Sequence, residues 1–181
     1  MITYVALLRA VNVGGTGLLS MKDLVALAEA VGLRNARTYI QSGNLIFESD
    51  LAKSQIQDCL AQALHNRMGR KVGVILRTPA ELRSAADANP FPDRPPARVA
   101  VIFLPAAADP KAFENLLGPA GEEVRVTRSE IYIYYPEGLG RSKLKVPAIA
   151  AEGTARNVNT VRKLVSLCTS TPPTVKKRHE K

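Results

Sequence analysis

The sequence predicts an α+β fold made of two similar, tandem halves, and three observations support this prediction. Short apolar runs of strand length alternate with longer segments whose apolar residues recur at helical spacing. The predicted order over residues 1–78 is strand, helix, strand, strand, helix, strand, and residues 79–168 repeat most of it. The proline-rich stretch at residues 89–96 is typical of a rigid, extended connection between halves.

The first half carries the clearer pattern. Residues 2–8 predict a buried strand, and Ser20 is placed to cap a helix that Gly32 ends. The other predicted elements are strands at 36–41 and 44–48, a helix at 53–68 and a strand at 72–77. Gly43 supplies the positive φ that a tight turn between the first two of these strands needs. This β-α-β-β-α-β order is that of the ferredoxin-like plait.

The second half repeats this pattern less completely. Thr78, Pro79 and Glu81 predict the capped start of a short helix. The further predicted elements are a central strand at 98–104, a helix from Asp109 to about Leu117, hairpin strands at 123–127 and 131–135, and helices near 142–151 and 157–168. A final strand is not predicted. We therefore expect two tandem ferredoxin-like halves with antiparallel sheets and extra C-terminal helices, followed by a flexible basic tail at residues 169–181.

Positive charge is concentrated near the end of the chain. The 181 residues carry a formal net charge of +9, with 46% hydrophobic and 23% charged residues. Residues 141–181 hold ten basic and two acidic side chains, whereas residues 1–140 hold fifteen and fourteen. Such a block favours anionic partners, namely nucleic acid or phosphorylated small molecules, although a basic tail can also serve solubility alone.

The sequence predicts neither a cofactor nor a metal site. Cys59 and Cys168 are far apart and lie in helical patterns, which favours free buried thiols in a reduced compartment. The spacing of His, Cys, Asp and Glu fits no metal site. No apolar run approaches the ~18 residues of a membrane helix, and the first residues lack a basic leader. We therefore expect a cytoplasmic protein without membrane partners, and the oligomeric state is not predicted.

Two polar clusters lie on predicted loops, where binding sites are usually built. The first contains Arg9, Asn12, Gly14 and Gly15, and a glycine-rich loop before a helix can wrap its amides around a phosphate. It matches no nucleotide-binding motif, so a flexible turn explains it equally well. The second is the run Gln41, Ser42, Gly43 and Asn44. A hairpin turn accounts for its glycine but not for the polar residues on either side.

Two basic clusters lie at predicted helix starts. One contains Arg141, Ser142 and Lys143, and the other contains Arg156 and Asn157. Helix starts carry free N–H groups and partial positive charge, so cations beside them favour a phosphate or other oxyanion. The competing interpretation is that Arg156 and Asn157 only cap and brace the last helix.

The leading functional hypothesis is a protein that binds a phosphate-bearing ligand or nucleic acid at a basic cleft between the halves. Its predicted site residues are Arg9, Asn12, Gly14, Gly15, Gln41, Ser42, Asn44, Arg141, Ser142, Lys143, Arg156 and Asn157. One alternative is a small enzyme for an anionic metabolite, with Glu152 as the base. Another is an interaction module without catalysis. Tyr132, Tyr134 and Tyr135 could stack nucleic-acid bases on an open sheet, or fill a core.

Five ordered segments together resemble the domain-of-unknown-function family 1697. They are LLRAVNVGG, RTYIQSGNLIFES, RTPAEL followed by NPF, YYPEGLGRSKL and TARNVNTVRKL. The resemblance spans residues 2–167 and implies an α+β fold with two plait-like halves, but no catalytic residues. One departure is visible, because the family usually has tryptophan where this chain has Val158. If that position faces a ligand the site is altered, whereas in the core it has no functional consequence.

Overall fold

Two four-stranded antiparallel sheets frame the part of the chain that the structure describes, which confirms the α+β class. The computed structural model describes residues 1–9, 11, 19–113, 116, 118–127 and 129–169. The first sheet has the strand order β2-β3-β1-β4, and the second has the order β6-β7-β5-β8. In chain order the elements are β1 (Ile2–Arg9), α1 (Met21–Ala30), β2 (Arg34–Tyr39), β3 (Asn44–Ser49), α2 (Lys53–Met68), β4 (Gly73–Arg77), α3 (Pro79–Asp87), η1 (Pro96–Arg98), β5 (Val99–Phe103), η2 (Pro110–Phe113), β6 (Glu123–Val126), β7 (Glu130–Tyr134), η3 (Leu139–Arg141), α4 (Ala148–Glu152), β8 (Thr154–Asn157) and α5 (Val158–Thr169).

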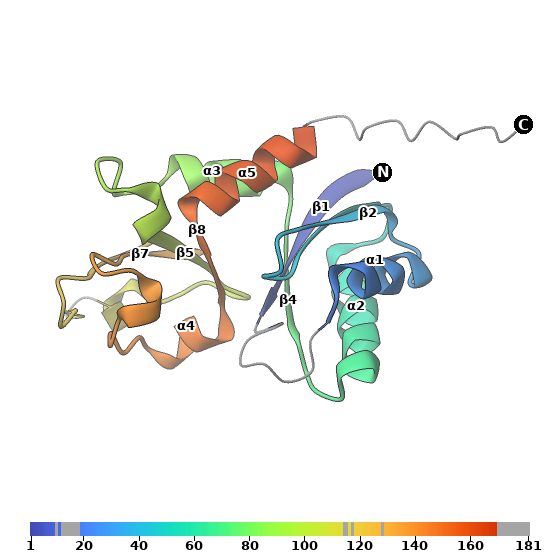
Figure 1. Ribbon diagram of the computed structural model, residues 1–181, viewed down its shortest axis with the longest axis horizontal. Helices are drawn as coiled ribbons and strands as arrows, with labels where there is room; N and C mark the ends of the chain where they lie inside the picture. The colour runs from blue at the N-terminus through green and yellow to red at the C-terminus, as the bar shows by residue number, and fades with distance from the viewer. Residues whose placement is uncertain (10, 12–18, 114–115, 117, 128, 170–181) are drawn as a thin grey trace, which may run out of the picture.

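The first sheet is apolar on both faces at its central strand β1. Tyr4, Ala6 and Leu8 point to the face that α1 and α2 cover, where they join one core cluster. Val5 and Leu7 point to the opposite face and join a different cluster. Because successive side chains of a strand alternate between faces, a strand buried on both sides must be apolar throughout. Figure 1 shows α1 and α2 on the outer side of this sheet.

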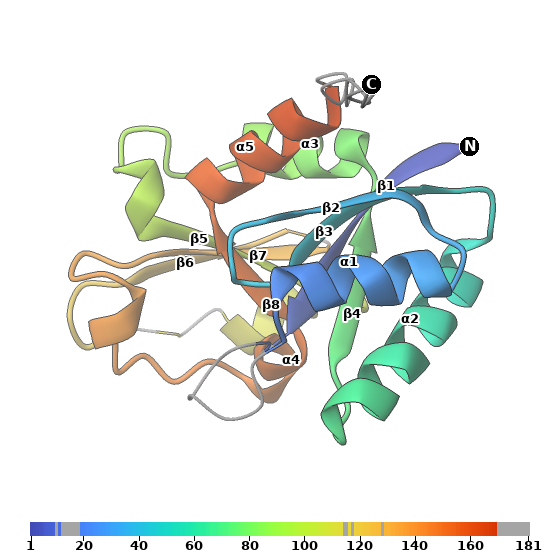
Figure 2. The same ribbon diagram turned by 45° about the vertical axis from the view of Figure 1, so that its right-hand side comes forward.

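A central core joins the two sheets. It contains Val5 and Ile46 of the first sheet together with Val101 and Tyr132 of the second. Helices α3 and α5 close this core, and they lie side by side over the junction in Figures 1 and 2. The outer face of the second sheet forms a third cluster, packed against the segments around η2 and α4.

Several sequence predictions hold at the level of single residues. Ser20 caps α1 by accepting a hydrogen bond from Asp23 N, and Gly43 has φ 76° in the turn between β2 and β3. The predicted helix at residues 53–68 coincides with α2. Thr78 and Glu81 form the predicted reciprocal capping box of α3. These features rest on local chemistry, which a sequence carries directly.

Three predictions for the second half are wrong. A final strand is present, because β8 pairs antiparallel with the edge of β5. The helix predicted near residues 142–151 is only α4, since Pro147 stands at its N-cap and the preceding residues are not helical. Of the helix predicted from Asp109 to about Leu117, residues 110–113 form the 3-10 turn η2, and residues 114, 115 and 117 lie outside the described residues. The predicted tail also begins too early, because Thr169 is the last residue of α5; residues 170–181 lie outside the described residues.

Candidate functional site

Arg156 ties the two sheets together at their junction. It lies on β8 and is only 7% exposed, yet its guanidinium reaches the first sheet. Its Nε donates to Asn44 Oδ1 at 2.6 Å, and its Nη2 donates to the carbonyl oxygens of Ser42 at 2.8 Å and Leu8 at 3.0 Å. The polar turn at residues 41–44 and the basic cluster at Arg156 are therefore brought together, as the sequence hypothesis requires.

Nη2 also donates to Gly43 O at 3.4 Å, and the remaining guanidinium contacts lie within β8. Nη1 donates to Thr154 Oγ1 at 2.8 Å and to the carbonyl of Ala155 at 2.7 Å. Burial lowers the pKa of Arg156 to about 10, so the side chain is still a cation at neutral pH. Its donors point at protein oxygens, so the main role of Arg156 is to hold the two sheets together. We call this set of hydrogen bonds the brace.

Asn44 stabilises the turn to which Arg156 donates its hydrogen bonds. The side chain is fully buried, and its Nδ2 donates to Tyr39 O at 3.0 Å and to Ser42 Oγ at 2.9 Å. Gly43 is needed for a second reason besides its φ, since a Cβ there would lie 2.9 Å from Leu8 Cβ. The turn is consequently held against β1 by both packing and hydrogen bonds.

A pocket of about 250 Å³ opens beside this brace. The turn after β2, the start of β5, the segment after β7 and the join between β8 and α5 all contribute to it. Its described lining residues are Ile40, Ser42, Ala97, Arg98, Ala100, Tyr135, Leu139, Ala155, Arg156, Asn157 and Thr160. These lining residues include two arginines and no acidic residue. The pocket therefore attracts an anion, because no carboxylate in the lining offsets the positive charge.

The polar groups of this pocket come from separate elements. Arg98 is exposed and donates from Nη1 to the carbonyl of Pro136. Asn157 Oδ1 accepts from Thr160 N at 2.8 Å and so caps α5, as the sequence predicts. The pocket therefore combines one exposed cation with the capped start of a helix.

The other predicted site residues that the structure describes lie in separate places. Arg9 donates from Nη1 to Ala151 O at 2.6 Å, on the α4 side of the junction, and Gln41 is exposed in the turn. Ser142 donates to Glu122 and accepts from Leu144 N, away from the pocket. Arg141 and Lys143 are exposed on either side of Ser142 and do not line the pocket, whereas the predicted residues Asn12, Gly14 and Gly15 lie outside the described residues.

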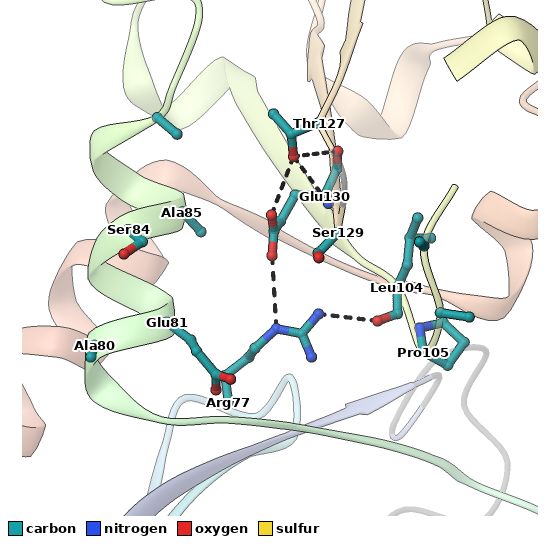
Figure 3. Close-up of a pocket in the computed structure, with 13 residues that line it drawn as sticks. Arg77, Ala80, Glu81, Ser84, Ala85, Leu104, Pro105, Thr127, Ser129 and Glu130 are labelled. Carbon is teal, nitrogen blue, oxygen red and sulfur yellow. Dashed lines mark hydrogen bonds and ion pairs between the residues drawn. The ribbon is translucent and has the colours of Figure 1, made fainter. Parts of the chain in front are cut away.

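A second, larger pocket of about 620 Å³ lies between α3 and the turn from β6 to β7. Figure 3 shows Arg77 pointing across it toward Glu130. The Nε of Arg77 lies 3.8 Å from Glu130 Oε1, and its Nη2 donates to Leu104 O at 3.0 Å. Glu81 also lines this pocket and pairs with Lys53 at 2.7 Å. Since both carboxylates have cationic partners, this pocket is close to electrically balanced and carries no preference for anions.

The structure decides three of the alternatives that the sequence left open. Tyr132 is fully buried, Tyr135 is 6% exposed, and the half-buried ring of Tyr134 packs against Phe91 and lies under the guanidinium of Arg94. These rings therefore have partners within the protein and do not form an open stacking surface. Val158 is fully buried in the central core, which makes the residue type at that position a matter of packing. Glu152 is exposed on α4 and does not line the junction pocket, which removes the reason to assign it as a base.

Sequence reasoning missed Arg98, Ile40 and Leu139 at this pocket. Arg98 looks like an ordinary polar residue at the start of a strand, and the two aliphatic residues look like members of a core. The exposure of Ile40 and Leu139, at 47% and 56%, marks them as unusual in the structure. Among the described residues there is no group of His, Cys, Asp and Glu that could hold a metal ion, and no helix long and apolar enough to cross a membrane.

This arrangement belongs to a protein family without an assigned activity. The chain is a member of the DUF1697 family, whose model is described as a protein of unknown function and matches residues 1–132. Among solved structures it is similar to the conserved bacterial protein SP0830 from Streptococcus pneumoniae, with a TM-score of 0.75 and 22% sequence identity over 94% of this chain and 99% of that chain. At this identity the likeness shows the fold alone. No curated protein matches the chain.

Proposed function

We propose that the junction pocket binds a small ligand that carries a phosphate group. The observation that carries the proposal is the charge of the described lining, which contains Arg98 and Arg156 and no carboxylate. Arg98 is exposed, and its guanidinium has further N–H groups besides the one that contacts Pro136. A phosphate accepts such hydrogen bonds in the paired geometry that guanidinium favours.

The size of the pocket supports a small ligand over a nucleic acid. Its volume of about 250 Å³ lies below the usual range of about 300–1,000 Å³ for drug-sized ligands. A single strand of nucleic acid instead needs an open basic groove with exposed aromatic rings. The burial of Tyr132 and Tyr135 removes two of the rings that such a groove would use.

The proposal is for binding and does not include catalysis. A general base must lie within hydrogen-bond reach of the group it deprotonates. None of the described lining residues is a carboxylate, a histidine or a cysteine. The cationic groups can hold and orient an anion, which is the role the geometry supports.

A calorimetric titration of the full chain with inorganic phosphate and methyl phosphate tests the proposal. We expect Arg98→Ala to weaken binding about 10-fold or more, because a hydrogen bond to a charged group contributes about 1.5–3 kcal/mol. Arg83→Ala is the matched control, since Arg83 is exposed on α3 and does not line the pocket. Equal affinities for the two variants, or no binding of either anion by the unsubstituted chain, would overturn it.

We also propose that the chain is organised as two ferredoxin-like halves, residues 1–78 and 79–168. The strands of the first sheet all lie within Ile2–Arg77, and those of the second lie within Val99–Asn157. Both sheets have the same order when their strands are numbered within each half. The second half departs from the plait by having η2 and the short α4 in place of two full helices. The junction pocket then lies between two structural repeats, where ligand sites are often found.

A further inference from the structure

The junction pocket exposes apolar side chains at the same place as its cations. Among the described residues, five large hydrophobic side chains are exposed, and two of them, Ile40 and Leu139, line this one pocket. The other three, Met1, Ile2 and Leu51, do not line it. Solvent-exposed apolar side chains next to polar groups in a pocket are typical of a ligand site.

Ile40 is held in place by the same network that braces the junction. Its φ of 53° lies in the left-handed region, which is a true outlier for a β-branched residue. The Asn44 side chain donates to the carbonyl of Tyr39, immediately before Ile40, and to the hydroxyl of Ser42 shortly after it. Because Arg156 also donates to the carbonyl of Ser42, hydrogen bonds hold the backbone on both sides of Ile40, and the side chain is kept at the pocket.

Leu139 is coupled to the cation through the segment after β7. Arg98 donates to Pro136 O through its side chain and accepts from Tyr135 N at 2.9 Å through its carbonyl. Gly138 N donates to Tyr135 O at 3.0 Å, and this turn leads into η3, which begins at Leu139. One stretch of hydrogen-bonded backbone thus sets the positions of both the Arg98 guanidinium and the Leu139 side chain.

From this geometry we propose that the pocket selects phosphate monoesters that carry one compact apolar group, such as an aromatic ring, between Ile40 and Leu139. The inference rests on the proposed function, because it places the phosphate at Arg98. The alanines at positions 97, 100 and 155 line the same pocket and leave room for the ring. Burial of a ring against these side chains adds affinity in proportion to the apolar area that leaves water.

The first test is a calorimetric titration of the full chain with inorganic phosphate, methyl phosphate and phenyl phosphate. We expect phenyl phosphate to bind about tenfold tighter than methyl phosphate, and Leu139→Ser to remove most of that preference. Leu51→Ser is the matched control, because Leu51 is similarly exposed, at 42%, and does not line the pocket. The control should keep the full preference for phenyl phosphate.

Ile40→Asn gives a second variant that separates stability from ligand preference. Asparagine tolerates the left-handed conformation, so the melting temperature should rise or stay unchanged. The preference for phenyl over methyl phosphate should nevertheless fall, because one apolar wall is lost. A variant that was merely misfolded would lose melting temperature and affinity together.

The outcomes separate the two proposals. If inorganic phosphate and methyl phosphate bind through Arg98 but phenyl phosphate binds no tighter, the apolar selection is overturned and the phosphate site stands. If Leu139→Ser and Leu51→Ser reduce phenyl phosphate binding equally, the ring binds elsewhere and the apolar selection is again overturned. If none of the three anions binds, the phosphate site fails and the selection fails with it.

Discussion

Arg156 is a buried cation whose hydrogen-bond partners are neutral oxygens. It contacts Asn44 Oδ1 and carbonyl oxygens of Leu8 and Ser42, and among the described residues no carboxylate forms an ion pair with it. Such a group is stable only if its donors are satisfied, because an unpaired buried charge is very costly. The same requirement makes the junction rigid, since any shift between the sheets would break several of these bonds at once.

The first prediction concerns this residue. Arg156→Ala should lower the free energy of unfolding by about 3 kcal/mol, because it leaves buried acceptors in both sheets without donors. The measurement is urea denaturation followed by circular dichroism. Arg162→Ala, an exposed arginine on α5, should change stability by less than about 0.5 kcal/mol. In a double-mutant cycle with Asn44→Ala, a coupling energy near zero would show that the brace contributes nothing.

The second prediction concerns Glu122, which is 6% exposed beside the predicted residue Ser142. The Ser142 hydroxyl, and after it the Ala120 N–H, lower the pKa of Glu122 below its ordinary 4.5. A carboxyl whose pKa is lower in the folded state stabilises the fold above the unfolded pKa, and this contribution is lost as the pH falls through the folded pKa. Melting temperatures between about pH 5 and pH 3 should therefore fall less steeply for Glu122→Gln than for the unsubstituted chain.

Glu137→Gln is the control for this pH dependence, because Glu137 is an exposed carboxylate in the same half. It should keep the slope of the unsubstituted chain. Identical slopes for the two variants would mean that Glu122 is not preferentially ionised in the folded state. The prediction also gives Ser142 a role in holding Glu122, which is different from the ligand contact that the sequence suggests.

The polar clusters show where sequence reasoning about the site ends. The turn at residues 41–44 and Arg156 were expected to meet, and they do, but they meet through direct hydrogen bonds to each other. Carbonyl and amide oxygens of the protein satisfy a guanidinium by the same chemistry as ligand oxygens. A sequence pattern therefore cannot distinguish a brace from a binding site, and that these clusters bind a ligand stays a prediction.

At the scale of elements, strand β8 explains the largest error of the sequence analysis. Its four residues, Thr154–Asn157, include three polar side chains and look like a loop. Thr154 and Arg156 are nevertheless buried, because β8 lies against β1 of the first sheet and donates hydrogen bonds to Leu8 O. Long, periodic elements such as α2 are predicted well, since their pattern reflects their own burial. A short strand defined by its neighbours has no such pattern.

The third prediction tests the join between α4 and β8. At Gly153 an added Cβ would lie 2.6 Å from Ile102 Cγ2 and 2.7 Å from Phe103 O. Gly153→Ala should therefore push β8 away from β5 and lower the free energy of unfolding by about 1–3 kcal/mol, as measured by urea denaturation. Gly140→Ala is the matched control, because nothing lies within 4 Å of its added Cβ. Equal stabilities for the two variants would show that the backbones do not approach this closely.

At the scale of the whole molecule, two arginines cross the junction in opposite directions. Arg156 runs from β8 to the first sheet, and Arg77 runs from β4 to Leu104 O, next to β5, and to Glu130 of β7 in the second sheet. Arg77 also lies over the ring of Phe103, with 5.5 Å from Cζ to the ring centroid. Between these contacts lies the central core, to which both sheets contribute. The two sheets thus share one buried apolar core.

This shared core leads to the last prediction, which is that the two sheets unfold as one cooperative unit. Ile46→Val in the first sheet should lower the free energy of unfolding by about 1 kcal/mol, because Ile46 is fully buried in the central core. Native-state hydrogen exchange measures how this loss is distributed over the two sheets. Amides that exchange only through global unfolding report the global free energy of unfolding. The slowest amides of β5, in the other sheet, should lose the same ~1 kcal/mol of protection as those of β1. If β5 keeps its protection while β1 loses it, residues 1–78 open alone, and the proposed halves are separate folding units joined by the arginine contacts.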